Sequence, residues 1–266
     1  MAESTLNVVE ESLVRKRIGD FLKARSAGRS PLGDAFSRIE ANKWCAVIFG
    51  GVLRDLTILG PSEVPRDIDV VVDVPHSQLE TVFSDLIFSK NRFGGLRLKS
   101  SNLTIDLWAL ENTWALRHEP TESLSFERLV RTTFLNVEAV AADVLSGRGQ
   151  KRKIYSAGFF ETIRRRIVDI SFEPNPYPQL CVVRSLITAL KLDWAVSKRL
   201  ASYIVHQATL VSVQTLIDVQ RSHYGKVRIS GPRMQRYVET LEHMLMNSKA
   251  EALRMTATSE RRVAKG

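Results

Sequence analysis

Residues 49–74, FGGVLRDLTILGPSEVPRDIDVVVDV, limit the folds open to this chain more than any other stretch. A Gly-Gly pair ends one short apolar run at residues 46–49, and a second apolar run opens at Asp67. Short runs rich in Val and Ile predict buried strands. We expect a strand at residues 46–49, a helix at residues 52–59 and a second strand from Asp67, which places an α/β element at the centre of the fold.

Two aspartates open the second expected strand. Because residues i and i+2 on a strand project to the same face, Asp67 and Asp69 direct their carboxylates to one side, while Ile68 and Val70 turn inward. Two neighbouring carboxylates repel each other unless a cation lies between them. Mg²⁺, or Mn²⁺ in its place, takes one or two carboxylates together with phosphate oxygens. The pattern predicts a metal site, which we favour over a solvated strand end.

The glycine pair predicts a phosphate-binding turn. Gly50 and Gly51 lie between the first strand and the helix, where glycine allows backbone N–H groups to approach a triphosphate closely. Arg54 lies on the same helix and is a candidate for a charged phosphate contact. Asp55 is expected to be structural, with Arg54 as one possible partner, and Asp73 is expected to be solvated.

A third carboxylate follows from an expected hairpin. Residues 94–100 and 103–110 read as two strands that are joined through Ser101 and Asn102. Asp106 lies between Ile105 and Leu107, where a charge is costly without a partner. A metal shared with Asp67 and Asp69 would offset that cost. We favour this role over that of an acid on an edge strand.

The segments GGVLRDL and PRDIDVVV resemble the head-domain signature of the class II tRNA CCA-adding enzymes and bacterial poly(A) polymerases, within the polymerase-β-like nucleotidyltransferase superfamily. The resemblance implies an α+β nucleotidyltransferase head with a mixed sheet and flanking helices, followed by an all-α neck. It implies that Gly50 and Gly51 hold the triphosphate and that Asp67, Asp69 and Asp106 hold the metals.

Weaker matches continue the resemblance to about residue 210. Arg131 and Asn136 lie where the family contacts the sugar, with plain surface roles as the alternative, and residues 157–163 match a short turn and helix. Asn175 lies where the family opens its neck and reads the base with an Asp and an Arg. Here Asn175 and Pro178 replace that pair, so strict selection of C and then A is not expected.

Composition is in line with a partner that is a polyanion. The 266 residues carry a formal net charge of +9, with a pI of about 9.8. Five basic clusters stand out, although such runs are usually solvated helix faces: 15–17, 151–153, 164–166, 198–199 and 226–236.

Cys45, expected in a core strand, and Cys181, expected in a helix, indicate no disulfide framework. Lacking a signal peptide or a membrane-length apolar run, the chain is expected to be cytoplasmic.

The expected organisation has four parts: an N-terminal helix and linker at 1–33, the head at 34–170, the helical neck at 171–255 and a basic mobile tail at 256–266. Helices are expected at 10–24, 35–43, 76–89, 180–192, 196–207 and 232–253. The strand pattern ends after about residue 170.

We expect a metal-dependent, template-independent transfer of NMP or dNMP from a nucleoside triphosphate (ATP, dATP or CTP) to a hydroxyl, with release of pyrophosphate. The favoured acceptor is a nucleic-acid 3′ end in tRNA or an oligonucleotide. Other possibilities are synthesis of a short oligonucleotide, de novo or self-primed, in antiviral defence, or transfer to tRNA or protein as a toxin with an operon-encoded partner protein. A non-enzymatic alternative is an RNA-binding module with an inactive head.

Overall fold

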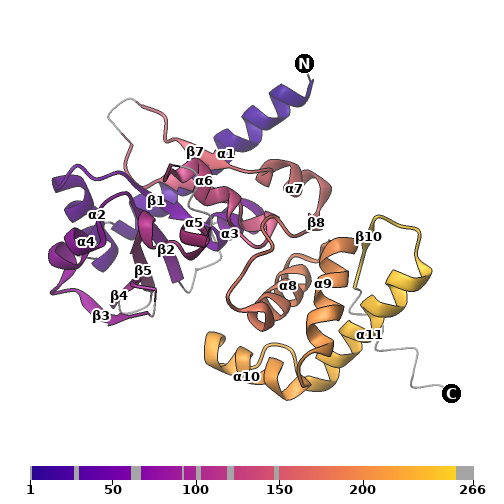
Figure 1. Ribbon diagram of the computed structural model, residues 1–266. Helices are drawn as coiled ribbons and strands as arrows, with labels where there is room; N and C mark the ends of the chain where they lie inside the picture. Colours follow the sequence, from indigo (N-terminus) through magenta and orange to yellow (C-terminus); the bar gives the residue numbers. More distant parts are fainter. Residues whose placement is uncertain are drawn as a thin grey trace. The chain divides into compact units, whose positions relative to one another are not determined.

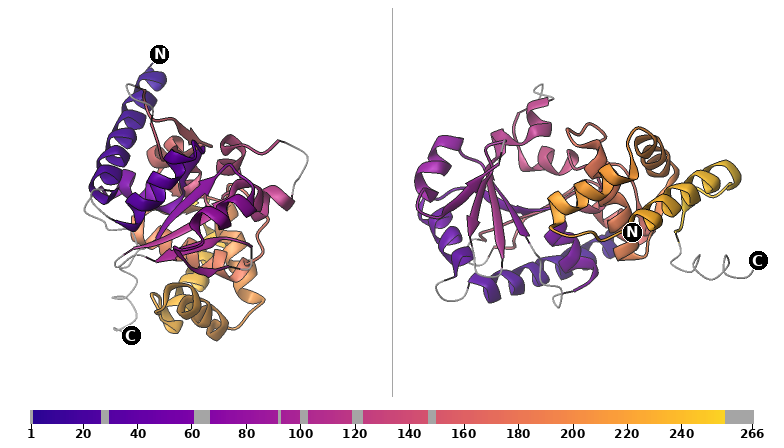
Figure 2. Two further views of the ribbon diagram at one scale, coloured as in Figure 1. Left: turned by 90° about the vertical axis from the view of Figure 1, so that its left-hand side faces the viewer. Right: turned by 90° about the horizontal axis from the view of Figure 1, so that it is seen from below.

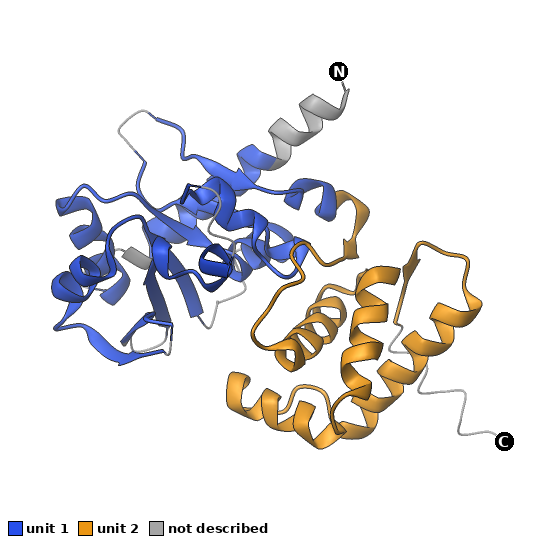
Figure 3. Cartoon of the chain, viewed as in Figure 1, with its two compact units in different colours: residues 1–163 blue, residues 164–266 orange. Residues whose placement is uncertain are grey.

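The computed structural model describes residues 2–26, 30–60, 67–91, 93–99, 103–118, 123–146 and 150–255. The chain forms two compact units, residues 1–163 and residues 164–266 (Figure 3). The expected boundary at residue 170 therefore falls inside the second unit, and the expected N-terminal part belongs to the first. The expected tail at 256–266 lies outside the described residues.

Unit 1 is built on a seven-stranded mixed sheet in the order β3-β4-β5-β2-β1-β6-β7 (Figure 1). Strands β2 and β5 pair in parallel, and the other neighbours pair antiparallel. The strands are β1 (Ala46–Phe49), β2 (Asp67–Val72), β3 (Ile87–Lys90), β4 (Leu96–Lys99), β5 (Thr104–Ala109), β6 (Val140–Asp143) and β7 (Ile154–Ser156).

Four helices that precede β3 in the chain contribute, together with Phe159 further along, to a core on one face of this sheet (Figures 1 and 2). They are α1 (Ala2–Ser26), α2 (Pro31–Ala41), α3 (Gly51–Ile58) and α4 (His76–Phe83). The alternation of strand side chains fixes what faces them, since Ile68, Val70 and Val72 of β2 are buried in this core. Asp67 and Asp69, which have the opposite parity, must therefore project from the other face.

A smaller core covers part of that other face. It is formed by Val47 and Val71 of the sheet with residues of α5 (Trp114–His118) and α6 (Phe126–Arg131). Phe49 and Trp108 pack against it, with their rings in an edge-to-face contact and their ring centroids 6.3 Å apart. Short elements complete the unit: η1 (Leu110–Asn112), η2 (Asn136–Glu138) and α7 (Phe159–Arg165).

Two expectations for unit 1 are wrong. The expected helix at 76–89 ends at Phe83, and β3 follows it. Ile87 and Ser89 are half-buried while Phe88 and Lys90 are exposed, so the period-2 pattern of a strand prevails once β4 is there to pair with it. Cys45 is exposed rather than in the core, because β1 begins one residue later at Ala46.

Unit 2 is mainly helical, with α8 (Pro178–Leu192), α9 (Lys198–Thr209), α10 (Val213–Tyr224) and α11 (Gly231–Asn247). It also holds a small sheet in the order β10-β9-β8, which the sequence did not lead us to expect. Its strands are β8 (Ile167–Val168), β9 (Ala195–Ser197) and β10 (Ala252–Leu253). Two expected helices have other bounds than expected: α9 begins two residues later, after β9, and α11 ends at Asn247, ahead of β10. The α+β fold with a helical C-terminal part is confirmed.

Local capping explains where α9 begins. Ser197 is extended, and its Oγ accepts a hydrogen bond from the Leu200 backbone N–H at 3.0 Å. The expected helix start at Val196 is therefore two residues early. Among the described residues, no single helix is long and apolar enough to span a membrane; α9 and α10 meet that test only as a pair, by length and composition, and are bent by 107° at their junction.

Candidate active site

Asp67 and Asp69 lie on β2, on the face of the sheet that the larger core does not cover. Both are partly exposed, whereas the intervening Ile68 is fully buried. Their Cα atoms are about 6.5–7 Å apart, as expected for residues i and i+2 of a strand. The folded sheet thus presents two carboxylates side by side, as the sequence predicts.

Asp106 joins them from β5. It is the register partner of Asp69 in the parallel β2–β5 pair, and strands so paired lie about 4.8 Å apart. Ile105 and Leu107 point into the larger core, so Asp106 lies on the same face as Asp69. The structure therefore brings together the three predicted acids, although a helix and two strands lie between Asp69 and Asp106 in the sequence.

Arg97 of β4 is a fourth member of this cluster. Its Nε donates to Asp106 Oδ1 at 2.8 Å and its Nη2 donates to Asp106 Oδ2 at 3.2 Å. Asp106 raises the pKa of Arg97 most, through this hydrogen bonding, and the charges of Asp67 and Asp69 raise it further. The guanidinium thus lies in the field of all three carboxylates.

Our reading of the sequence missed Arg97, although a signal was present. A hairpin that turns at Ser101 and Asn102 places residue 97 opposite residue 106, and opposite charges at such a pair stabilise each other. The charge of Asp106, which the sequence led us to assign to a metal, is offset by Arg97 in this structure.

The glycine pair forms the junction of β1 and α3. Gly50 has φ +71° and ψ −125°, a backbone conformation that side chains disfavour, and its N–H donates to the Val140 carbonyl at 2.9 Å. Phe49, the last residue of β1, is the register partner of Asp69. The turn that follows Phe49 therefore lies at the end of the sheet where β2 begins with its two aspartates. Gly51 is the first residue of α3.

Arg54 ties this helix to its surroundings. Its Nη1 donates to Glu138 of η2 at 2.7 Å, and its Nε donates to Asp55 at 2.8 Å. The Arg54 and Glu138 side chains are only 11% and 9% exposed. The expectation that Asp55 pairs with Arg54 is confirmed. Arg54 has a structural role in this fold, and its contact with a triphosphate stays a prediction.

The remaining predicted residues lie in three places. Asn136 is half-buried at the start of η2, next to Glu138, and Arg131 is exposed at the end of α6. Asn175 belongs to unit 2, where its Oδ1 accepts a hydrogen bond from the Tyr177 N–H at 2.9 Å ahead of α8. Their contacts with sugar and base stay predictions. Asp73 is exposed, as expected.

The acids on β2 suit a hard divalent cation. Mg²⁺ needs only one or two protein carboxylates, and Asp67 and Asp69 supply two on one strand face. Within the described ranges, no group of three or more His, Cys, Asp or Glu side chains is arranged as a metal site. Asp106 is already held by Arg97, so this ion pair would compete with a metal for its carboxylate.

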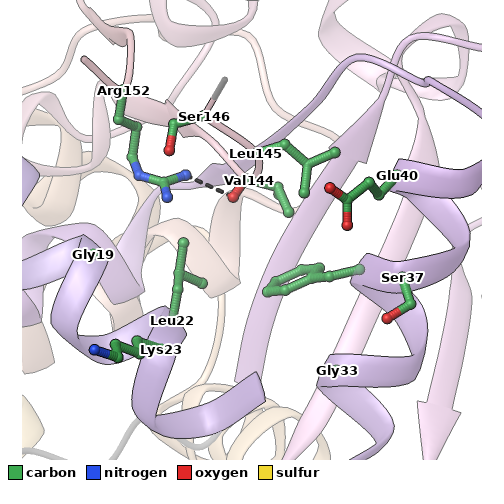
Figure 4. Close-up of a pocket in the computed structure, with 11 residues that line it drawn as sticks. Gly19, Leu22, Lys23, Gly33, Ser37, Glu40, Val144, Leu145, Ser146 and Arg152 are labelled. Carbon is green, nitrogen blue, oxygen red and sulfur yellow. Dashed lines mark hydrogen bonds between the residues drawn. The ribbon is translucent and has the colours of Figure 1, made fainter. Parts of the chain in front are cut away.

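A cavity of about 360 Å³ lies elsewhere in unit 1, between α1, α2 and the end of β6 (Figure 4). Lys23, Glu40 and Arg152 are among the residues that line it. Arg152 Nη1 donates to the Asp143 and Val144 carbonyls, so this guanidinium is already engaged in hydrogen bonds with the backbone. None of the predicted site residues lines this cavity.

No family model matches the chain, and no curated protein matches it. Solved structures do. A CCA-adding enzyme with CTP is 15% identical, with a TM-score of 0.58, over 85% of this chain and 55% of that one. A tRNA nucleotidyltransferase with a primer tRNA and an incoming ATP analog is 15% identical, with a TM-score of 0.55, over 79% and 62%.

The Thermotoga maritima CCA-adding enzyme complexed with tRNA is 14% identical, with a TM-score of 0.57, over 85% of this chain and 54% of that one. The chain therefore shares the fold of the CCA-adding and tRNA-processing nucleotidyltransferases, which confirms the resemblance read from its motifs. It spans little more than half the length of these structures.

Proposed function

We propose that this protein is a metal-dependent nucleotidyltransferase. The observation that carries the proposal is the meeting of Asp67, Asp69 and Asp106 on one sheet face, next to the Gly50 turn, in a fold shared with CCA-adding enzymes. Carboxylates that lie this close together suit phosphoryl transfer, because a bound divalent ion can bridge them to a triphosphate.

Each residue has a defined task in this proposal. The Gly50-Gly51 turn receives the triphosphate, since a side chain at either position would narrow the approach to the backbone. Asp67 and Asp69 hold Mg²⁺ or Mn²⁺, with Asp106 as a third ligand. When bound, the metal polarises the phosphates and lowers the pKa of an acceptor hydroxyl. The acceptor hydroxyl would release its proton to water, and its oxygen would bond to the α-phosphorus as the bond to pyrophosphate breaks.

A nucleic-acid 3′ end, with tRNA as first candidate, is the acceptor we propose. The chain is strongly basic, and four exposed cations surround the start of α11: Lys226, Arg228, Arg233 and Arg236. The Arg228 guanidinium lies 4.8 Å from the centre of the Tyr224 ring, which adds an aromatic surface beside the charge. Such a surface suits single-stranded nucleic acid.

A labelling experiment tests the proposal. Each α-labelled NTP and dNTP is incubated with the full chain and Mg²⁺ or Mn²⁺, alone and with total tRNA, and the products are separated on a gel. Label in tRNA supports the proposal and identifies the base. A ladder of labelled oligonucleotides, or labelled protein, would retain the transfer chemistry but contradict the acceptor. No product, together with tRNA binding that Asp67→Asn leaves intact, would favour a binding module.

A further inference from the structure

The ion pair between Arg97 and Asp106 engages the one carboxylate of the acid cluster that could join Asp67 and Asp69 as a third metal ligand. Both oxygens of Asp106 accept hydrogen bonds from the guanidinium, at 2.8 and 3.2 Å. A carboxylate that is bound in this bidentate way has a lone pair of each oxygen engaged and its charge offset, so the guanidinium and a metal compete for it. This inference rests on the proposed function.

The pair is placed so that it can open. The Arg97 side chain is 51% exposed and that of Asp106 is 22% exposed. Exposed ion pairs contribute little net free energy, because water solvates both partners well when they separate. A divalent ion next to Asp69 and Asp106 would in addition repel the guanidinium. Metal binding and the ion pair are therefore in competition for one carboxylate.

We propose that Arg97 is a built-in counter-cation that holds Asp106 until a divalent metal displaces it. In the absence of metal it offsets the repulsion among three carboxylates that share one sheet face. In exchange it weakens the affinity of the site for metal. Arg97 thus sets the metal concentration at which the third carboxylate becomes available.

The test is a Mn²⁺ titration of the full chain, followed by the EPR signal of free Mn²⁺. Arg97→Gln should bind Mn²⁺ about tenfold more tightly than the wild type, because Asp106 no longer has to be released from a guanidinium. Arg38→Gln is the matched control. Arg38 forms a bidentate pair with Asp85, at 2.5 and 2.7 Å, and that variant should bind Mn²⁺ as the wild type does.

The Asp106→Asn background separates competition from a general charge effect. Competition predicts that Arg97→Gln tightens Mn²⁺ binding in the wild type but not in Asp106→Asn, because the released carboxylate is no longer there, whereas a general charge effect predicts the same gain in both. Equal or weaker binding by Arg97→Gln overturns the inference, as does an equal gain in the Asp106→Asn background.

Failure of the inference and failure of the proposed function look different. Mn²⁺ binding that is lost in Asp67→Asn/Asp69→Asn but is unaffected by Arg97→Gln contradicts only the role of Arg97. Binding that Asp67→Asn/Asp69→Asn leaves unchanged contradicts the metal site itself. Absence of binding in every variant, Arg97→Gln included, contradicts both.

Discussion

Asp69 and Asp106 face each other across the parallel strands β2 and β5. A parallel pair needs a crossover, and here the chain forms α4, β3 and β4 before it returns as β5. The acid cluster therefore depends on the whole of this crossover being folded. Any variant that disturbs β4 or β5 must be checked for folding before its chemistry is interpreted.

Gly50→Ala should destabilise unit 1 by about 1–3 kcal/mol, since φ +71° with ψ −125° is a conformation that a Cβ strains. Urea unfolding, followed by circular dichroism, measures the change. Space is not the cause, because the nearest heavy atom to an alanine Cβ would be the Glu138 carbonyl oxygen at 4.0 Å. A neutral result would mean that the backbone relaxes at this turn.

Gly19→Ala is the matched control, with the opposite sign. Gly19 lies within α1, and a Cβ there meets no heavy atom within 4 Å. Alanine should stabilise the helix by about 0.5–1 kcal/mol, because it restricts the unfolded chain more than glycine does. Destabilisation by Gly19→Ala would show that the urea assay reports something other than backbone preference.

Arg54→Met should cost about 3–5 kcal/mol of unfolding free energy, because it leaves the buried Glu138 carboxylate without its guanidinium partner. Glu138→Gln should cost less, since an amide keeps a hydrogen-bond acceptor without a buried charge. The double variant should cost less than the sum of the two. Additive effects in this cycle would show that the two side chains do not stabilise each other.

The sequence was sufficient for the strands that carry the site. β1 was predicted at its observed bounds, and Asp67 and Asp69 were placed on one face because strand alternation is a local rule. Asp106 was added to them from the cost of an unpaired charge between Ile105 and Leu107 and from the family resemblance. β3 was not, since Leu86 and Ile87 suit a helix face as well as a strand until β4 is known to lie beside them. Of the two partners of Arg54, Asp55 was predicted and Glu138 was not, because Glu138 is 84 residues away in the sequence.

The small sheet of unit 2 was missed for a related reason. β8 and β10 are two-residue strands, too short to show a period of their own, and each is defined only by its pairing with β9. Tertiary pairing decides such segments, and local propensity does not.

Stability should depend on pH through Asp143. Burial raises the pKa of its carboxyl above the ordinary 3.8, although a hydrogen bond from the Tyr155 hydroxyl at 3.2 Å opposes the shift. Between the unfolded and the folded pKa the folded chain keeps a proton that the unfolded chain has lost. Stability must therefore fall as pH rises through that interval.

Asp143→Asn removes this titration. Relative to the wild type, the variant should gain stability between pH 4 and pH 7, as measured by urea midpoints at the two pH values. A difference between the two proteins that stays constant, or that changes in the wild type's favour as pH rises, would show that burial does not govern this carboxyl.

The rate of nucleotide transfer in Asp69→Asn, set against Asp73→Asn, tests the central claim most directly. Both changes neutralise an aspartate of the same strand parity, but Asp73 is exposed beyond the end of β2, whereas Asp69 faces Asp106. We predict that Asp69→Asn reduces metal-dependent incorporation of labelled nucleotide to background and that Asp73→Asn retains the wild-type rate, with both variants folded. Equal rates in the two variants would contradict a metal-dependent active site on this face of the sheet.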